Sequence, residues 1–275
     1  NKGIMTENVA FQAIDYLVKN STDELLHIAF LGGEPLLNFP LLKKVVEYCK
    51  QISADTGKKF SYTITTNGTL ITDNIEKYLT ENKIVCQISL DGTKEKNDMN
   101  RFFRNKKGSY DVIVEKTKSM RHMNLVTARA TVTPDNSDYK EIFNHLNELE
   151  FRAIPIAIAQ NMVDDEQFDK ILYDIFYFEE LILTKQYAKA KKMTDLVNAL
   201  EKIEFGNVRN NGCGAGRTMF AVDIDGTLYP CHRFVGERKF ALGNIWTGSD
   251  NSKFLKMINV RNRDKCCLLY TSPSP

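Results

Sequence analysis

The 275-residue chain has no long apolar run, no block of like charge and no secretion signal. A membrane-spanning helix needs ~20 consecutive apolar residues, and no run approaches that length. The N-terminus also lacks the basic segment followed by an apolar one that marks a signal peptide. With 37 Lys and Arg against 35 Asp and Glu, the formal charge is +2, which gives no electrostatic reason to expect a nucleic-acid or membrane partner. The sequence therefore predicts a cytoplasmic protein that binds neither.

Cysteine is too sparse and too scattered for the disulfide framework of a small secreted domain. The six cysteines are Cys49, Cys86, Cys213, Cys231, Cys266 and Cys267. Cys49 falls in an amphipathic helical pattern and Cys86 in a strand pattern, so both are predicted to be buried apolar side chains. For the others, metal binding or catalysis is favoured over disulfide formation.

Short apolar segments alternate with amphipathic helical ones along most of the chain. Strands are predicted at residues 26–31, 60–66, 84–90, 126–132 and 154–159, and helices at 7–19, 41–53, 74–81, 110–123, 139–149 and 165–205. Such alternation indicates a parallel sheet covered by helices, as either a closed or partial barrel or an open doubly wound sheet. Because residues 1–6 carry no element, we expect a first strand to be missing upstream.

Three consecutive predicted strands end in small polar residues and glycine. The strand at 26–31 is followed by Gly32, Gly33, Glu34 and Pro35. The strand at 60–66 ends in Thr65, Thr66, Asn67 and Gly68, and the strand at 84–90 ends in Ser89, Leu90, Asp91 and Gly92. Ligands of parallel α/β proteins bind at this edge of the sheet. Two glycines followed by a carboxylate suit a ligand with an ammonium group, since the backbone can approach it closely.

The composition changes after Phe205, where a glycine-rich segment leads into a predicted β-hairpin with Asp225-Gly226-Thr227 at its tip. Cys213 precedes this hairpin and Cys231 ends it, so the hairpin could bring the two thiols together. His232 adjoins Cys231. Cys266 follows a basic segment.

Together these motifs resemble a radical S-adenosylmethionine (SAM) enzyme with a SPASM-type C-terminal extension. The markers are GGEP at 32–35, TTNGTL at 65–70, SLDG at 89–92, CGAGR at 213–217, DGTLYPCHRFVG at 225–236 and LGNI at 242–245, and they cover residues 1–266. The resemblance implies an α/β fold, a partial (β/α) barrel that lacks its first strand. It implies a core over residues 1–160, a helical bridge over 161–205 and an incomplete SPASM domain over 206–267.

The resemblance also implies roles for the residues at the strand ends. Gly32, Gly33, Glu34 and Pro35 would bind the methionine amino group of SAM. Thr66, Asn67, Ser89, Asp91 and Arg101 would complete the cofactor site, with the ribose and methionine carboxylate as their targets. Arg129, inside a strand, could reach the same pocket or pair with an acidic neighbour.

In the C-terminal part, Cys213 and Cys231 would hold one auxiliary [4Fe–4S] cluster, and Cys266 would begin the ligand set of a second. Relatives that carry the YPCHRFVG form resemble peptide maturases, including those that form thioether crosslinks. His232 stands where sulfatase-maturing enzymes have an acidic proton acceptor, and a histidine could take that catalytic role. The implied reaction is cleavage of SAM to a 5′-deoxyadenosyl radical that takes hydrogen from a peptide, with an external electron donor.

Two departures from the family pattern suggest that the chain is a fragment, inactive as it stands. The C-x3-C-x2-C cysteines that hold the reducing [4Fe–4S] cluster are absent, and residues 268–275 have the composition of a non-native tail. Three alternatives stay open: formylglycine formation of the anaerobic sulfatase-maturing type, a Cys3His zinc module without radical chemistry, and a different barrel enzyme with a phosphorylated substrate. No glycine-rich phosphate loop followed by Lys-Ser or Lys-Thr supports the last.

Overall fold

The computed structural model describes residues 3–159, 162–205 and 214–259, which fall into two compact units. One unit comprises Asn1–Leu26, Asn38–Phe60 and Asn207–Pro275, and the other comprises His27–Leu37 and Ser61–Gly206. The division cuts the first two strands of the larger sheet near their N-terminal ends. The carboxyl ends of all its strands therefore belong to the second unit.

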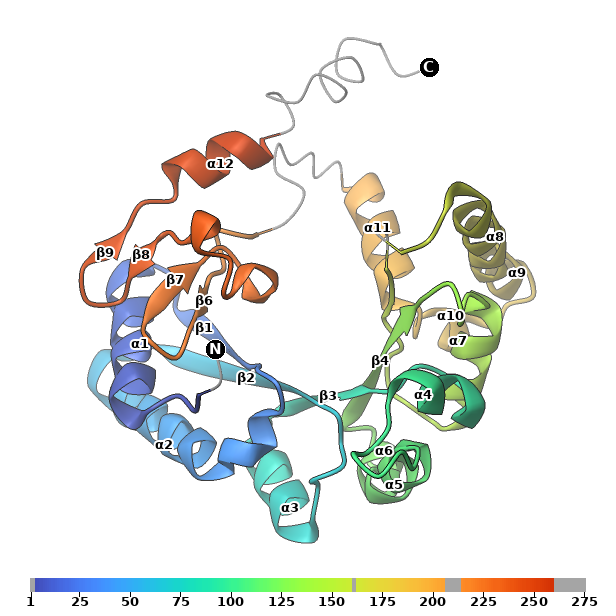
Figure 1. The fold of residues 1–275 in the computed structure, drawn as a ribbon, viewed down its shortest axis with the longest axis horizontal. Helices are drawn as coiled ribbons and strands as arrows, with labels where there is room; N and C mark the ends of the chain where they lie inside the picture. Colours follow the sequence, from blue (N-terminus) through green and yellow to red (C-terminus); the bar gives the residue numbers. More distant parts are fainter. Residues whose placement is uncertain (1–2, 160–161, 206–213, 260–275) are drawn as a thin grey trace. The chain divides into compact units, whose positions relative to one another are not determined.

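The larger sheet has five strands in sequential order (Figure 1). They are β1 Leu25–Phe30, β2 Lys59–Thr66, β3 Val85–Ser89, β4 Val126–Val132 and β5 Ile156–Ile158. The pairings from β2 to β5 are all parallel. The parallel α/β sheet predicted from the alternating pattern is confirmed, although β5 is shorter than the predicted strand at 154–159.

The outward face of this sheet carries the core of the second unit. Ile64, Cys86, Ile88, Val126 and Ala128 are fully buried there. The covering helices are η1 Pro35–Asn38, α3 Asp73–Glu81, α4 Lys94–Asn100, α5 Tyr110–Lys116, α6 Lys118–His122 and α7 Tyr139–Glu148. Their buried side chains include Leu79, Ile113, Met120, Ile142 and Phe143. The opposite face of the sheet is polar and is described with the site.

Two predicted helices are divided in the structure. The one expected at 110–123 breaks into α5 and α6 at Thr117, whose hydroxyl bonds the Ile113 carbonyl at 2.8 Å and so competes with the helical ladder. The single stretch expected at 165–205 is four helices: α8 Asp165–Ile175, α9 Tyr177–Leu183, α10 Tyr187–Ala190 and α11 Thr194–Glu204. One break follows α9, where Lys185 takes a left-handed φ of 61°.

The first unit joins two long helices to a small antiparallel sheet. Its helices are α1 Glu7–Asn20, α2 Phe39–Thr56, η2 His232–Phe234, η3 Arg238–Phe240 and α12 Ser252–Ile258. The sheet has the order β6 Ala221–Val222, β7 Thr227–Tyr229, β8 Gly243–Asn244 and β9 Gly248–Ser249. Val9 of α1 is buried against Leu228 and Ile245. The predicted hairpin is present, with Ala221 opposite Tyr229 across β6 and β7.

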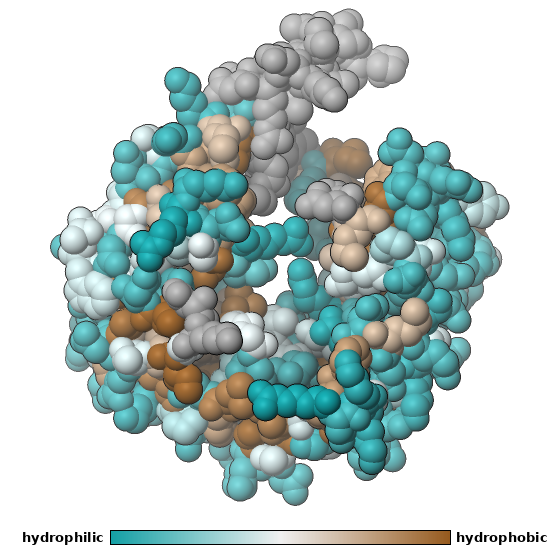
Figure 2. Space-filling model, viewed as in Figure 1, coloured by the Kyte–Doolittle hydropathy of each residue, from teal (hydrophilic) through white to brown (hydrophobic). Residues whose placement is uncertain are grey.

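Residues before and after the larger sheet therefore share one compact unit, and the helices α8 to α11 belong to the unit of the sheet. The domain boundaries at 160, 205 and 267 remain predictions. No described helix is long and apolar enough to cross a membrane. The face drawn in Figure 2 is mostly hydrophilic, with its apolar residues in separate patches.

Candidate functional site

The Glu34 carboxylate is fixed to the carboxyl end of β2. Its Oε1 accepts hydrogen bonds from the Thr66 hydroxyl at 2.7 Å and the Leu36 amide at 3.1 Å, and its Oε2 accepts one from the Asn67 amide at 2.8 Å. Three donors from two elements hold this half-buried side chain in one orientation. The arrangement brings together Glu34, Thr66 and Asn67, as the sequence predicts.

The two glycines before Glu34 leave open space beside the backbone. A Cβ atom at Gly32 or Gly33 would meet no heavy atom within 4 Å. Packing within the described chain therefore does not require glycine at either position. A ligand that approaches the backbone closely would use this space, which Cβ atoms would partly fill.

A tight turn holds the end of β2. The Thr66 hydroxyl accepts from the Gly68 amide at 3.1 Å while it donates to Glu34, and the Asn67 amide oxygen accepts from the Thr69 amide at 2.9 Å. Gly68 has a φ of 76°, and a Cβ there would lie 3.3 Å from the Ile113 side chain. Glycine is required here, both by the backbone conformation and by the close approach of the helix layer.

Ser89, the last residue of β3, lies beside Arg129 in the middle of β4. They are register partners, and both are partly exposed. The Arg129 guanidinium makes no hydrogen bond or ion pair with any described residue, whereas its backbone carbonyl accepts from the Leu90 amide at 3.2 Å. A partly buried guanidinium normally has a partner, so this position suits an anionic ligand group.

Asp91 and Arg101 pair with each other at the same edge. The Arg101 guanidinium donates to the Asp91 carboxylate at 2.6 and 3.2 Å, and the Thr131 amide donates to the same carboxylate at 2.9 Å. The Asn136 side chain also donates to the Asp91 carbonyl, at 2.6 Å. These bonds tie the end of β3 to β4 and to the segment after α4. A cofactor-binding role for either residue remains a prediction.

Sequence reasoning missed the polar inner face of the sheet, which extends behind these residues. His27 bonds Ser61 at 2.9 Å through Nδ1 and Thr63 at 3.0 Å through Nε2, and Thr65 bonds Gln87 at 3.2 Å. Parallel strands are usually apolar on both faces. The available signal was the alternation of polar residues along two strands, at Ser61, Thr63 and Thr65 and again at Gln87 and Ser89.

Cys86 lies on the buried face behind the site. Burial raises the pKa of its thiol to about 12, and the Glu34 carboxylate adds to the rise. The thiol is therefore protonated at neutral pH and is neither a nucleophile nor a metal ligand. This confirms the prediction that Cys86 is a buried side chain, and Cys49 is also buried.

Of the predicted C-terminal site, the structure describes Cys231 and His232, whereas Cys213 and Cys266 lie outside the described residues. Cys231 is half-buried directly before η2, and His232 is exposed as the first residue of η2. No group of three His, Cys, Asp or Glu side chains within 3–159, 162–205 and 214–259 is arranged to hold a metal ion. The fit of auxiliary clusters therefore rests on the sequence.

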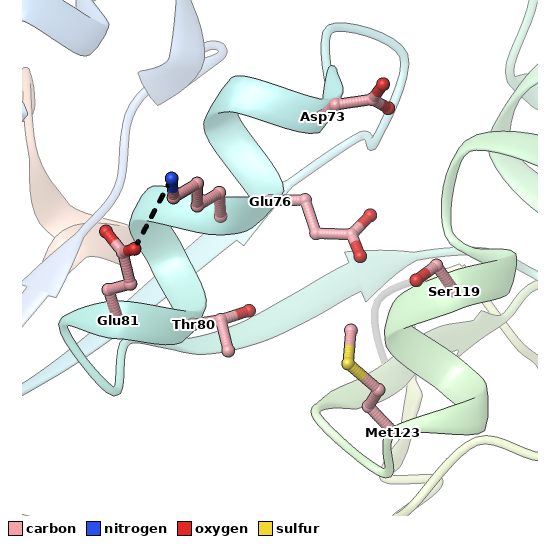
Figure 3. A pocket seen from close by; sticks show the side chains of 7 residues that line it. Asp73, Glu76, Thr80, Glu81, Ser119 and Met123 are labelled. Atoms are coloured by element: carbon pink, nitrogen blue, oxygen red, sulfur yellow. Dashed lines mark ion pairs between the residues drawn. The ribbon is translucent and has the colours of Figure 1, made fainter.

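A hollow of about 360 Å³ lies on the helix layer, away from the strand ends. Helices α3 and α6 form it, and Figure 3 shows Asp73 and Glu76 on one side with Ser119 and Met123 on the other. Its one basic side chain, Lys77, pairs with Glu81 at 3.9 Å. Surface carboxylates without a further ligand group do not define a site, so we assign it no function.

Comparison with known proteins identifies the family. The profile of the radical SAM superfamily matches residues 4–149. A cysteine-type anaerobic sulfatase-maturating enzyme of Clostridium novyi is 27% identical over 235 residues, which cover 78% of this chain and 61% of that enzyme. The radical SAM cyclopropyl synthase TigE of Paramaledivibacter caminithermalis is 29% identical over 169 residues, or 60% of this chain and 34% of that enzyme.

The structure of native anSMEcpe with bound AdoMet and Kp18Cys peptide superposes with a TM-score of 0.77 at 23% identity, covering 98% of this chain and 77% of that one. This likeness confirms the predicted partial-barrel α/β fold. The chain spans about 61% of the length of the Clostridium novyi relative. Because the family profile covers more than half of its residues, the chain belongs to the radical SAM superfamily.

Proposed function

We propose that the whole protein binds SAM at the carboxyl ends of β1 to β4 and uses it to modify a peptide. When bound beside a reduced [4Fe–4S] cluster, SAM supplies radical hydrogen-atom abstraction. This chain contains no C-x3-C-x2-C triplet, so we assign none of its residues to that cluster. Its own residues bind and orient the cofactor.

The observation that carries the proposal is the placement of two opposite charges along one strand edge. The Glu34 carboxylate is anchored to the end of β2. Arg129, whose guanidinium has no described partner, lies on β4 opposite Ser89 of β3. Neighbouring strands lie about 4.8 Å apart, so β2 and β4 are roughly 10 Å apart. An α-amino acid with hydrogen bonds of about 3 Å at its ammonium and carboxylate fits that span.

Each residue then has a distinct task. Glu34 accepts a hydrogen bond from the ammonium, because its carboxylate keeps about one lone pair beyond those used by Thr66, Leu36 and Asn67. Arg129 and Ser89 bind the methionine carboxylate. Gly32 and Gly33 allow the ligand to reach the backbone, while Pro35 fixes the exit of the chain from the strand.

The test is equilibrium dialysis of the full chain with SAM and with methylthioadenosine, which lacks the amino-acid moiety. We expect Arg129→Met to weaken SAM binding about 10-fold to 100-fold, the value of a charge-assisted hydrogen bond, and to leave methylthioadenosine binding unchanged. Arg152→Met, at an exposed arginine, is the matched control. Equal loss for both ligands, or no loss, would contradict the proposal.

The modification that we propose is a thioether crosslink in a peptide, with electrons from an external donor and the reaction in the cytoplasm. His232 would be the proton acceptor. Formylglycine formation is the second candidate, favoured by the sulfatase-maturating relative. Mass spectrometry of a Cys-containing peptide after turnover by the whole protein separates the two, because a thioether keeps the sulfur and loses two hydrogens, whereas formylglycine loses the sulfur.

We also propose that Cys213, Cys231 and Cys266 hold auxiliary [4Fe–4S] clusters. Anaerobic preparation should yield a brown protein whose iron and sulfide content falls in Cys231→Ala. A colourless protein with stoichiometric zinc would instead support the Cys3His module.

A further inference from the structure

A rigid basic hairpin, Arg101–Gly108, follows α4 at the edge of the candidate site. Phe102 and Gly108 form an antiparallel bridge. Within it, the Phe103 amide donates to the Lys107 carbonyl at 2.8 Å and the Lys106 amide to the Phe103 carbonyl at 2.9 Å. These bonds close a tight turn, so the tip holds its side chains on an ordered backbone.

The base of this basic hairpin is attached to the end of β3. Arg101 pairs with Asp91, two residues beyond Ser89. The amide and hydroxyl of Ser109 both donate to the Arg101 carbonyl, at 3.1 and 2.9 Å. A Cβ at Gly108 would overlap the Asp98 carboxylate, which would have to move and would lose its hydrogen bond from the Tyr110 amide. The base of the hairpin is thus attached to Asp91, two residues beyond the end of β3.

The tip carries three positive charges that no described residue neutralises. Arg104, Lys106 and Lys107 are exposed, and no acidic residue occurs between Met99 and Tyr110. The nearby lysines of α4 differ, because Lys94 pairs with Asp111 and Lys96 donates to the Asp135 carbonyl. The tip side chains of Arg104, Lys106 and Lys107, by contrast, make no hydrogen bond or ion pair with any described residue.

An exposed apolar surface lies next to these charges. The Phe102 side chain is 47% exposed, and the Lys106 ammonium lies 4.5 Å from the centre of its ring. Met99, at the end of α4, is 52% exposed. A surface that combines an aromatic ring with ammonium and guanidinium groups fits an acidic segment that also carries apolar side chains.

Lys106 occupies a backbone conformation that disfavours it. Its φ is 65°, in the left-handed region where glycine and asparagine are usual. The other described non-glycine residues with positive φ each lie one residue beyond the C-cap of a helix; they are Lys83, Asn124, Glu150 and Lys185. Lys106 alone among them forms a hairpin turn. A lysine at this position adds a charge to the tip at the cost of backbone strain.

We propose that this hairpin binds acidic residues of the peptide substrate, on the side of the residue that is modified. The inference rests on the proposed function, which places the peptide at the strand ends to which the base of the hairpin is attached. A nucleic acid fits the site less well. Proteins that bind DNA commonly make about 6–10 phosphate contacts, whereas the tip offers three isolated cations on a chain of net charge +2.

The test compares two fluorescein-labelled octapeptides with a central cysteine, one flanked by three glutamates and one by three glutamines. Fluorescence anisotropy with the full chain at low salt should show about tenfold tighter binding of the glutamate peptide, the combined value of three exposed ion pairs. High salt should reduce the difference. Reversal of Arg104, Lys106 and Lys107 to glutamate should abolish it. Reversal of the exposed Lys170, Lys185 and Lys191 is the control and should preserve it.

SAM binding separates this proposal from the previous one. The hairpin variant should bind SAM as the unchanged chain does, so a failure of the hairpin proposal leaves SAM binding intact. Equal affinity for the two peptides, or no binding of either, would overturn the hairpin proposal. Tighter binding of a fluorescein-labelled oligothymidine than of the glutamate peptide would assign the hairpin to nucleic acid instead.

A second pair of variants isolates Lys106 from general charge effects. Lys106→Gly and Lys185→Gly each remove one lysine from a left-handed position, with φ values of 65° and 61°. Both should raise the melting temperature by about 2–4 °C, because glycine adopts this conformation without strain. Only Lys106→Gly should weaken binding of the glutamate peptide. If both variants bind it equally, Lys106 has no part in recognition.

Discussion

The ion pair between Asp91 and Arg101 should be a main determinant of stability at the strand edge. The Asp91 carboxylate is 9% exposed and the Arg101 side chain 31%, so solvent screens the pair only in part. Two guanidinium hydrogen bonds and the Thr131 amide occupy the carboxylate. Both residues were predicted from the sequence to bind the cofactor. A stability measurement without SAM tests whether they act structurally.

Asp91→Asn keeps the shape of the side chain and one acceptor, which still serves the Thr131 amide. It replaces the acceptor of the Arg101 Nε bond by an amide, which we expect to cost about 2 kcal/mol, as charged hydrogen bonds do. Arg101→Met leaves the buried carboxylate with one donor and should cost about 3 kcal/mol, the low end for a broken buried pair because Arg101 is partly exposed. In the double variant the two losses overlap, so it should be about 1–2 kcal/mol more stable than their sum.

Urea denaturation followed by circular dichroism gives the four unfolding free energies. The hydrogen-exchange rate of the Thr131 amide measures the local stability of its bond to Asp91. This rate should increase more in Arg101→Met than in a control such as Arg104→Met at the hairpin tip. Additivity of the single losses within about 0.5 kcal/mol would show that the residues do not interact, and the structural argument would fail.

Three further predictions concern single positions. Gly68→Ala should lower the free energy of unfolding by about 2–3 kcal/mol, because it combines left-handed strain with a close contact to Ile113. Gly57 has a similar φ of 73° but open space around it, so Gly57→Ala should lower it by only about 1 kcal/mol. Thermal denaturation compares the two variants. Cys86 should resist alkylation by iodoacetamide at pH 8 in the native chain, since a pKa of about 12 leaves a thiolate fraction of about 10⁻⁴. Peptide mapping that finds Cys86 alkylated as fast as Cys231 would refute this. Burial lowers the pKa of His145, so below pH 6.5 the folded state binds fewer protons than the unfolded state. The free energy of unfolding should therefore fall as the pH is lowered through that range. In urea titrations at several pH values, His145→Gln should reduce this fall.

The fold could be predicted from the sequence where apolar periodicity and turn residues agree. Residues 126–132 were predicted as a strand and form β4 with the same bounds. Polar residues with glycine at the ends of three strands placed Glu34, Thr66 and Asn67 together, because parallel strands end at one edge. The contacts of Glu34 confirm that placement.

Two features could not be predicted because their causes are not local. No glycine or proline occurs between residues 165 and 205, so nothing marked the break after α9, where Lys185 adopts a conformation normally left to glycine. The role of Asp91 depends on Thr131 and Asn136, which lie 40 and 45 residues away. Sequence reasoning placed Asp91 at the edge but not in its ion pair with Arg101.

The polar inner face gives the strongest physical reason to expect a ligand at this sheet. Partly buried polar groups destabilise a fold unless they find partners, and on this face Thr65 finds one in the Gln87 side-chain amide of the neighbouring strand. Arg129 does not, although its outward-facing neighbours Ala128 and Ala130 are fully buried. An apolar side chain at position 129 would pack without the desolvation penalty of an unpaired guanidinium, so the guanidinium lowers the stability of the ligand-free chain. A bound anion at the edge that holds Glu34 would offset this loss. The charge at this position is thus consistent with the SAM site that we propose, since packing alone gives no reason for it.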